Sequence, residues 1–393
     1  MILEMILFLT LGILAGTISG LIPGLHINLI GVAVVSIAAT SVTSFPVYFV
    51  IFIAAMAITH TFLDFIPSIF LGCPNEDTSL SALPGHELLK QGRGYEAVLL
   101  STKGCFIGVF LLIIMTPLLL WLVPPIYQLI QKIIPYILIF VVLVLILTEK
   151  KKISTTIVII LTGVLGIIIL NLEIKESLLP LLSGLFGSSS LILSIKNKVQ
   201  IPKQEFTSPK VKYFKPILGS LIASPICGFL PGLGNSQAAV LGNTIARTER
   251  KDFLFLLGLT NLLVMGFSFI SIYAIAKGRT GVAVAIQNIL GTVELKYLML
   301  ILIIVLIAGI IAYYLSKKLA RFFANKINKI NYTKVSVATI ICLVILTLII
   351  SGFFGLIILI IATLTGIYCI NTGTKRTNMM GCLLIPTIIL YLF

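Results

Sequence analysis

Polar residues directly follow a Pro-Gly pair at two places in an otherwise apolar chain. Proline removes a backbone donor and glycine permits a tight turn, so each pair predicts a break in a helix. The half-helix after such a break begins with free N–H groups and a positive dipole end, which suits a carboxylate or a phosphate. The two stretches therefore predict a polar, anion-binding pocket, built from Pro23, Gly24, His26 and Asn28 and from Pro231, Gly232, Gly234, Asn235, Ser236 and Gln237.

Two pairs of ionisable residues are candidates for holding a coupling ion. Asp64 lies within an apolar run, and His60 precedes it by one helical turn on the same face. Ionisable side chains inside a membrane are costly and are functional candidates by default. Glu76 and Asp77 follow in the next polar stretch and could bind a cation. No resident cofactor or metal is expected; Na⁺ or H⁺ is the expected coupling ion.

Each of these features also has a structural explanation. The Pro-Gly pairs could simply kink packed helices, with Gly12, Gly16 and Gly20 serving close helix contact. His60 and Asp64 could be a mutually satisfied pair, and the acids at 76 and 77 could lie in a solvated loop. Lys90, Arg93 and Lys103 are basic candidates for an anion site but could equally be cytoplasmic anchors.

Composition identifies a polytopic membrane protein. Of the 393 residues, 59% are hydrophobic and 10% are charged, and apolar runs repeatedly reach the roughly 20 residues that a membrane helix needs. The N-terminus carries Glu4 in place of a basic region, which predicts a permanent membrane segment instead of a cleaved signal peptide. The net charge of +15 comes from short basic clusters between the apolar runs, which indicates topology and not nucleic-acid binding.

Apolar runs and breakers predict the same plan in both halves of the chain. The first half has a segment at 2–43 interrupted at Pro23-Gly24, and then spans near 46–71, 95–123, 125–148, 153–171 and 177–195. The second half has a segment at 214–245 interrupted at Pro231-Gly232, and then spans near 252–276, 296–316, 335–352, 353–371 and 378–393. We read each half as a broken helical hairpin plus about five transmembrane helices.

The basic clusters predict the orientation of these spans. An odd number of crossings inverts the second half, and under this scheme nearly all basic clusters fall on one side. We therefore expect an all-α protein of two inverted-topology repeats, with both termini outside the cell membrane. The repeats would span 1–195 and 214–393, joined by a basic cytoplasmic linker at 196–213. Secondary transporters commonly have this plan, with the substrate held at midplane between broken helices.

Three motifs give the chain a family resemblance. It resembles the large permease subunit, TctA, of the tripartite tricarboxylate transporters. GLIPGLHINLIG and GFLPGLGNSQAAVLG are similar to the family's glycine-rich helices that end in Pro-Gly-x-Gly. GCPNEDTSLSALPGHELLKQG at 72–92 resembles its Gly-x-Pro-Gly-Thr-Pro-x-Ser motif, and PLLSGLFG at 180–187 resembles a third motif. The resemblance adds Thr78 and Ser79 to the expected substrate-binding residues.

The resemblance implies a permease for a small organic anion, a di- or tricarboxylate, coupled to Na⁺ or H⁺. It also implies a small membrane subunit and an extracytoplasmic binding protein as partners; a homo-oligomer and a prokaryotic source are further expectations. His26 stands where the family has a second glycine, and Asn75-Glu76-Asp77 replaces Gly-Thr-Pro.

Two other functions stay open. The same fold could translocate a lipid-linked phosphate or another phosphate-bearing amphiphile. A membrane-embedded enzyme is the second alternative, but the sequence has no His-Glu-x-x-His and no Gly-x-Ser-x-Gly motif. We therefore expect a transporter and not an enzyme.

Overall fold

The described part of the chain is helical throughout. The computed structural model describes residues 2–22, 46–72, 77–172, 174, 176–196, 200–207, 211–229, 234–327 and 332–392. No strand occurs in these ranges. Eight of the described helices are long and apolar enough to cross a membrane, which agrees with the predicted class of all-α polytopic membrane protein.

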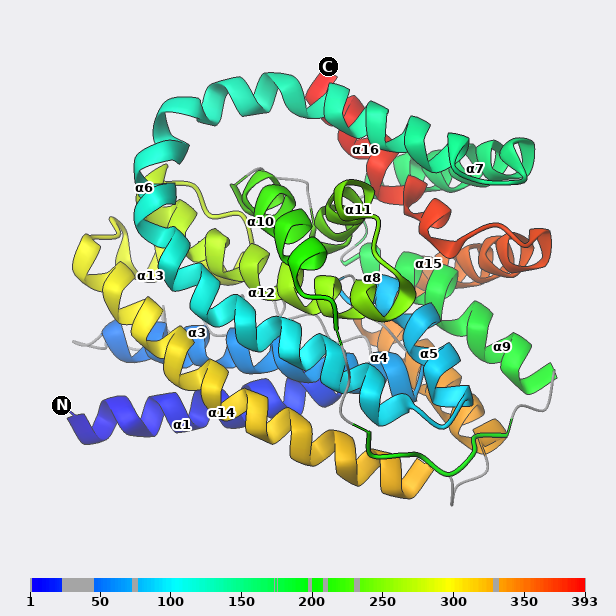
Figure 1. The fold of residues 1–393 in the computed structure, drawn as a ribbon, viewed down its shortest axis with the longest axis horizontal. Helices are drawn as coiled ribbons and strands as arrows, with labels where there is room; N and C mark the ends of the chain where they lie inside the picture. Colours follow the sequence, from blue (N-terminus) through cyan, green and yellow to red (C-terminus); the bar gives the residue numbers. More distant parts are fainter. Residues whose placement is uncertain are drawn as a thin grey trace.

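The helices follow one another in the order shown by colour in Figure 1. Up to residue 196 they are α1 (Ile2–Leu21), α3 (Pro46–Leu63), α4 (Phe65–Phe70), η1 (Ser79–Ser81), α5 (Ala82–Lys90), α6 (Gly94–Leu147), α7 (Lys152–Leu170), α8 (Leu178–Leu182), η2 (Ser183–Ser188) and α9 (Ser189–Lys196). From residue 214 they are α10 (Phe214–Phe229), α11 (Asn235–Ala246), α12 (Arg250–Ala274), α13 (Gly281–Leu290), α14 (Leu295–Ile327), α15 (Tyr332–Thr372), η3 (Arg376–Met380) and α16 (Gly381–Leu392).

Two helices form the centre of the molecule. Every residue of α12 from Asp252 to Ile272 is buried, and α3 with α4 buries residues 50–70 apart from Phe52. A helix that is apolar and buried on all sides belongs inside a bundle. Large exposed hydrophobic side chains lie on the outer helices, including Leu14 on α1, Ile160 on α7 and Ile349 on α15, where lipid tails would cover them.

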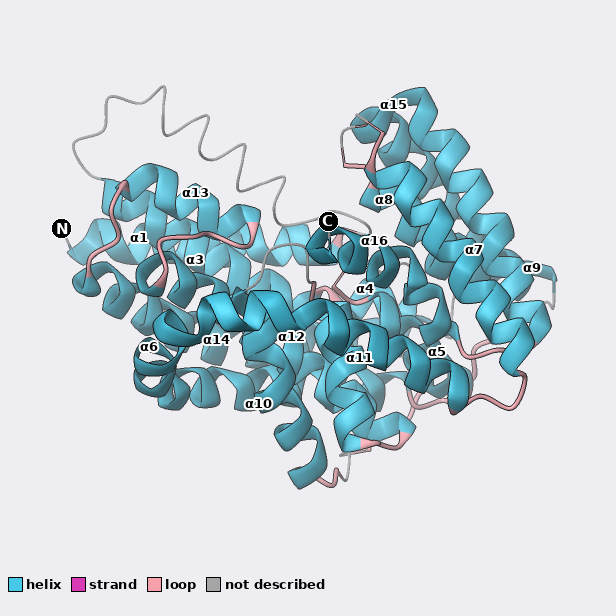
Figure 2. Cartoon of the chain, turned by 90° about the horizontal axis from the view of Figure 1, so that it is seen from above, coloured by secondary structure: helices cyan, strands magenta, loops and turns pink. Residues whose placement is uncertain are grey.

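Helices from the two ends of the sequence pack against each other. The long helix α6 packs on α12, and α14 packs on α3 and α6. At the α6–α12 crossing the backbones touch, because a Cβ atom on Gly258 would overlap the carbonyl oxygen of Ser101. The last helix, α16, packs on both α7 and α6, and α15 packs on α8, η2 and α9. Figure 2 shows α7, α8, α9 and α15 gathered at one end.

Glycines let α1 lie close to α3. A Cβ atom at Gly12, Gly16 or Gly20 would meet backbone or side-chain atoms of α3 in each case. Close helix contact is therefore one role of these three glycines, as the structural explanation of the sequence proposed.

Two predicted boundaries can be compared directly. The break between 335–352 and 353–371 is present inside α15 as a kink at Gly352, which has a positive φ of 68°. The boundary at Pro124-Pro125 is wrong, because α6 continues through Pro117, Pro124, Pro125 and Pro135. Prolines are tolerated inside membrane helices, and α6 bends in an arc over the molecule (Figure 1).

The predicted Pro-Gly breaks lie outside the described residues, as do Pro23, Gly24, His26, Asn28, Glu76, Pro231 and Gly232. The flanking helices are described: α1 ends at Leu21, α10 ends at Phe229 and α11 begins at Asn235. Lys212, just before α10, contacts Glu249, which follows α11, and Asp252, in the first turn of α12. The start of α10 and the end of α11 therefore lie on the same face of the molecule.

Polar contacts hold several basic segments together on the face that carries the start of α10 and the end of α11. Glu96 binds Arg93 and Lys251, Glu87 binds Arg250, and Gln204 accepts a hydrogen bond from the backbone N–H of Gly94 at 2.8 Å. Near α7 and η3, the Lys151 Nζ donates to the carbonyl oxygen of Thr372 at 2.8 Å. The part of the linker at 200–207 is therefore packed onto the protein and is not a free tether.

Candidate functional site

The candidate site forms where η1 meets the first turn of α11. The Ser79 Oγ and the Ser236 Oγ are 2.9 Å apart, and the Asn235 Nδ2 donates to the carbonyl oxygen of Asp77 at 2.9 Å. Residues 157 or more positions apart in sequence thus meet directly. Ser79, Ser236 and Asn235 are all buried.

The local sequence explains how each element presents its side chains. Gly234 is extended and precedes α11, and its N–H donates to the Gln237 Oε1 at 2.8 Å, which ties down the start of the helix. On the other side, the Thr78 carbonyl oxygen accepts bonds from the N–H and Oγ of Ser81, at 2.9 and 2.7 Å. The Ser68 Oγ donates to that carbonyl at 3.2 Å. These bonds form the turn that points Ser79 at α11.

One buried polar atom at this junction has no hydrogen bond within the described residues. It is the Oδ1 of Asn235, whose side chain is fully buried at the positive end of α11. The bond to Asp77 identifies the two ends of this amide, because a backbone carbonyl can accept a hydrogen bond from the amide nitrogen but not from the oxygen. The oxygen is an acceptor that a bound molecule or water would satisfy.

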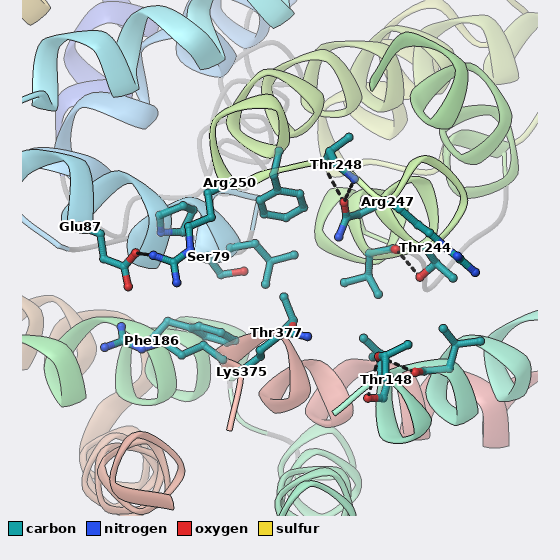
Figure 3. A pocket seen from close by; sticks show the side chains of 18 residues that line it. Ser79, Glu87, Thr148, Phe186, Thr244, Arg247, Thr248, Arg250, Lys375 and Thr377 are labelled. Carbon is teal, nitrogen blue, oxygen red and sulfur yellow. Dashed lines mark hydrogen bonds and ion pairs between the residues drawn. The ribbon is translucent and has the colours of Figure 1, made fainter. Parts of the chain in front are cut away.

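A cavity of about 540 Å³ lies beside this junction. Its lining comes from η1 and α5, from the end of α6, from η2, from α11 and the start of α12, and from η3 (Figure 3). Four basic side chains and one carboxylate line it: Arg247, Arg250, Lys375, Arg376 and Glu87. Figure 3 shows that Glu87 is bound to Arg250, so the lining carries a surplus of positive charge.

The rest of this lining is partly polar and partly apolar. Hydroxyl and amide groups come from Ser79, Thr148, Asn243, Thr244, Thr248 and Thr377, and apolar groups include Val144, Leu145, Phe186, Val240 and Phe253. The Asn243 Oδ1 accepts from the N–H and the Oγ1 of Thr248, at 3.1 and 2.6 Å. A cavity of this size with convergent cations suits a small organic anion.

Asp64 lies in the centre of the molecule, between α3 and α4. It is 4% exposed, and its Oδ2 accepts from the Asn261 Nδ2 of α12 at 3.4 Å. His60 is also buried, and its Nδ1 lies 3.0 Å from the Ser19 Oγ of α1. These contacts link Asp64 to the C-terminal part of the chain and His60 to α1.

The structure places the remaining sequence candidates as follows. Asp77 contributes its carbonyl oxygen to Asn235, and the Gln237 side chain caps α11. Arg93 is bound to Glu96 and does not line the 540 Å³ cavity. The sequence analysis used the basic clusters only to predict orientation, and so missed that four of their residues line the cavity: Arg247, Arg250, Lys375 and Arg376. Of these, only Arg247, which directly follows α11, lies near a predicted motif.

The fold and the cavity define a multi-pass membrane protein with a basic chamber between its N-terminal and C-terminal parts. The profile of the tripartite tricarboxylate transporter TctA family matches residues 6–381. The chain belongs to this family, which is a family of transporters and not of enzymes.

One curated relative covers almost the whole chain. It is the uncharacterized protein MJ1079 of Methanocaldococcus jannaschii, 34% identical over 403 aligned positions, which span 98% of this chain and 99% of the relative. No solved structure shows a detectable match to the chain.

Proposed function

We propose that this protein is a permease that carries a small organic anion, a di- or tricarboxylate, across the cell membrane. The observation that carries the proposal is the Ser79–Ser236 contact at the start of α11, beside a cavity with four basic side chains. The family is defined by tricarboxylate transport, and the chemistry of the lining agrees with that cargo.

The described residues divide the work of binding between two regions. Arg247, Arg250, Lys375 and Arg376 attract the anion into the cavity, because converging cations raise its local concentration. At the inner end, the N–H groups of α11 and the hydroxyls of Ser79 and Ser236 can donate to a carboxylate. The predicted residues of the Pro-Gly stretches would complete this inner region.

The same proposal assigns the coupling cation to Asp64. A carboxylate this deeply buried is costly when charged, unless a cation or a proton compensates it. Its contact with Asn261 joins α3 and α12, so the occupancy of Asp64 can affect how these central helices pack. Changing Asp64→Asn should abolish uptake driven by a Na⁺ or pH gradient and preserve exchange without a gradient; the exposed Glu294→Gln variant is the control.

The basic face is the cytoplasmic face in this proposal, with both termini outside. A small membrane subunit and an extracytoplasmic binding protein would then deliver substrate to the opposite face, as the tripartite family description implies. The basic cavity would be the cytoplasmic exit.

The apolar part of the lining favours one alternative cargo. Phe186, Val240 and Phe253 would also accommodate the hydrocarbon part of a lipid-linked phosphate, with its head group at the cations. A lipid-linked phosphate would bind the same basic residues as a carboxylate, so an experiment must distinguish the two cargoes.

The test is ligand-dependent thermal stabilisation of the purified protein, with carboxylates, inorganic phosphate and polyprenyl phosphate, each with and without Na⁺. We expect a saturable shift with a di- or tricarboxylate that disappears in the Ser79→Ala/Ser236→Ala double variant.

The matched control is Thr156→Ala, because the partly buried Thr156 donates to the Lys152 carbonyl of its own helix and does not line the 540 Å³ cavity. It should keep the full ligand-dependent shift. Stabilisation by polyprenyl phosphate alone would contradict the carboxylate proposal and support the lipid cargo.

A further inference from the structure

A second, smaller cavity lies where α5 meets α9, α15 and η3. Its volume is about 150 Å³, and it is lined by His86, Glu87, Lys90, Ser190, Leu193, Ser194, Ile370 and Arg376. Its volume is less than a third of that of the 540 Å³ cavity, which suits a small anion such as a single oxyanion group.

Two cations face this cavity from different elements. Lys90 comes from the C-terminus of α5, and Arg376 comes from η3. Within the described ranges, neither forms an ion pair with a carboxylate. Glu87 also lines the cavity, but its carboxylate is bound to Arg250.

Hydroxyl groups complete the wall. Ser190 and Ser194 are buried, at 5% and 4% exposure, one helical turn apart on α9. The Arg376 NH1 donates to the Ser190 Oγ, which in turn donates to the Phe186 carbonyl at 2.6 Å. This bond fixes the guanidinium at the cavity and leaves its other N–H groups to serve as donors.

Lys90 and Arg376 lie close enough to repel one another. Lys90 is exposed overall, but burial of its ammonium lowers its pKa, the nearby Arg376 lowers it further, and Glu87 opposes part of this shift. His86 adds no charge, because burial lowers its pKa to about 3. An anion between Lys90 and Arg376 would remove this repulsion.

From this geometry we propose a compact anion site in which Lys90, Arg376 and the hydroxyl of Ser194 bind a single oxyanion group, while Ser190 holds the Arg376 guanidinium in place. The group belongs either to inorganic phosphate or sulfate, or to one carboxylate of a larger anion that reaches in from the 540 Å³ cavity, because Arg376 and Glu87 line both. A bound group would link α5 to the α9–α15 end of the molecule. The site stands apart from the Ser79–Ser236 contact and does not depend on the proposed cargo.

The test is equilibrium binding of radiolabelled phosphate to the full-length protein in a buffer free of other oxyanions. We expect saturable binding that weakens at least about tenfold in Lys90→Gln and in Arg376→Gln, since each removes a charge-assisted contact. Lys150→Gln is the matched control, because Lys150 is exposed and lines neither cavity. Ser79→Ala/Ser236→Ala should bind phosphate like the wild type even if it no longer binds carboxylates.

Competition with sulfate and citrate separates the two sources of the oxyanion. Displacement by sulfate but not by citrate supports a site for an inorganic anion. Displacement by citrate that is itself weakened in Lys90→Gln supports a carboxylate reaching in from the larger cavity. The proposal is overturned if Lys90→Gln binds these anions as tightly as Lys150→Gln does, or if the wild type binds none of them. Among the described residues Lys90 makes no ion pair whose loss would unfold the protein, so this variant decides the question even if Arg376→Gln fails to fold.

Discussion

At the scale of single residues, the histidine next to the small cavity shows how burial fixes a charge state. His86 lies on α5, outside the candidate membrane spans. Burial lowers its pKa from 6.5 to about 3, with a further contribution from Lys90, and its Nδ1 lies 3.4 Å from the Ile69 carbonyl oxygen. The folded protein therefore holds this side chain neutral over the physiological pH range.

This pKa shift predicts a pH dependence of stability. Between pH 6.5 and about 3 the unfolded chain binds a proton at His86 that the folded protein does not, so folding stability falls as the pH is lowered through this window. Above pH 6.5 the contribution is constant. The thermal midpoint of the wild type should therefore fall relative to His86→Gln between pH 6.5 and 4, and the difference should stay flat from pH 7 to 8. A change in that difference between pH 7 and 8 would show that His86 titrates in the folded protein.

The residues of the candidate junction show what sequence can and cannot supply. Asn235 and Ser236 were predicted to bind substrate because they follow a Pro-Gly pair, and Ser79 because the stretch around it resembles a family motif. That Ser79 and Ser236 touch could not be predicted, since nothing in either motif encodes a partner 157 positions away. The basic lining of the cavity could not be predicted for a similar reason. A basic residue that marks the cytoplasmic side and one that lines a cavity cannot be told apart from the local sequence.

At the scale of helices, the spacing of α1 and α3 depends on glycine. A Cβ atom at Gly16 would overlap the Met56 carbonyl oxygen, and one at Gly12 would crowd Phe52 and Ala55. The small-residue stripe thus allows the backbones to come together where no larger side chain fits.

Gly16→Val should therefore be strongly destabilising. We expect a loss of about 1–3 kcal/mol of unfolding free energy from overpacking, measured in detergent by thermal or denaturant unfolding. Thr10→Val is the matched control on the same helix, because Thr10 is exposed and donates only to the Ile6 carbonyl at 2.8 Å. Equal effects of the two substitutions would contradict the tight α1–α3 contact.

Hydrophobicity located the helices well but placed some of their ends wrongly. The span predicted at 252–276 is α12 at 250–274, since a long apolar run between charged residues has few alternatives. The span predicted at 296–316 continues as α14 to Ile327, because the Lys-rich segment after the apolar run still favours helix. The break expected at Pro124-Pro125 is absent because a proline ends helices less reliably in a membrane than in water.

At the scale of the whole molecule, the two ends of the sequence are interleaved. The long α6 packs on α12, α14 packs on α3, and α16 packs on α7. The Ser79–Ser236 junction, the Asp64–Asn261 contact and both cavities all lie between residues of the N-terminal part and residues of the C-terminal part. A movement of one part against the other would therefore act on every one of these sites at once, as alternating access requires.

The orientation of this assembly predicts a labelling pattern. In a variant without native cysteines, a cysteine at Lys150 should react with an impermeant reagent only from the cytoplasmic side. A cysteine at Lys277, in the loop before α13, should react only from outside. Both positions are exposed or partly exposed, and labelling of both from the same side would contradict the proposed topology.

The most direct test of the central claim is exchange of a labelled tricarboxylate into proteoliposomes loaded with the unlabelled anion. Exchange needs no ion gradient, and protein molecules that insert inside-out expose the basic cavity to the added label. We predict rapid exchange by the wild type and by Thr156→Ala, and a loss of at least about tenfold in Ser79→Ala/Ser236→Ala, whose hydroxyls meet at the start of α11. Exchange by the double variant at the wild-type rate would contradict the claim that the anion passes through the Ser79–Ser236 junction.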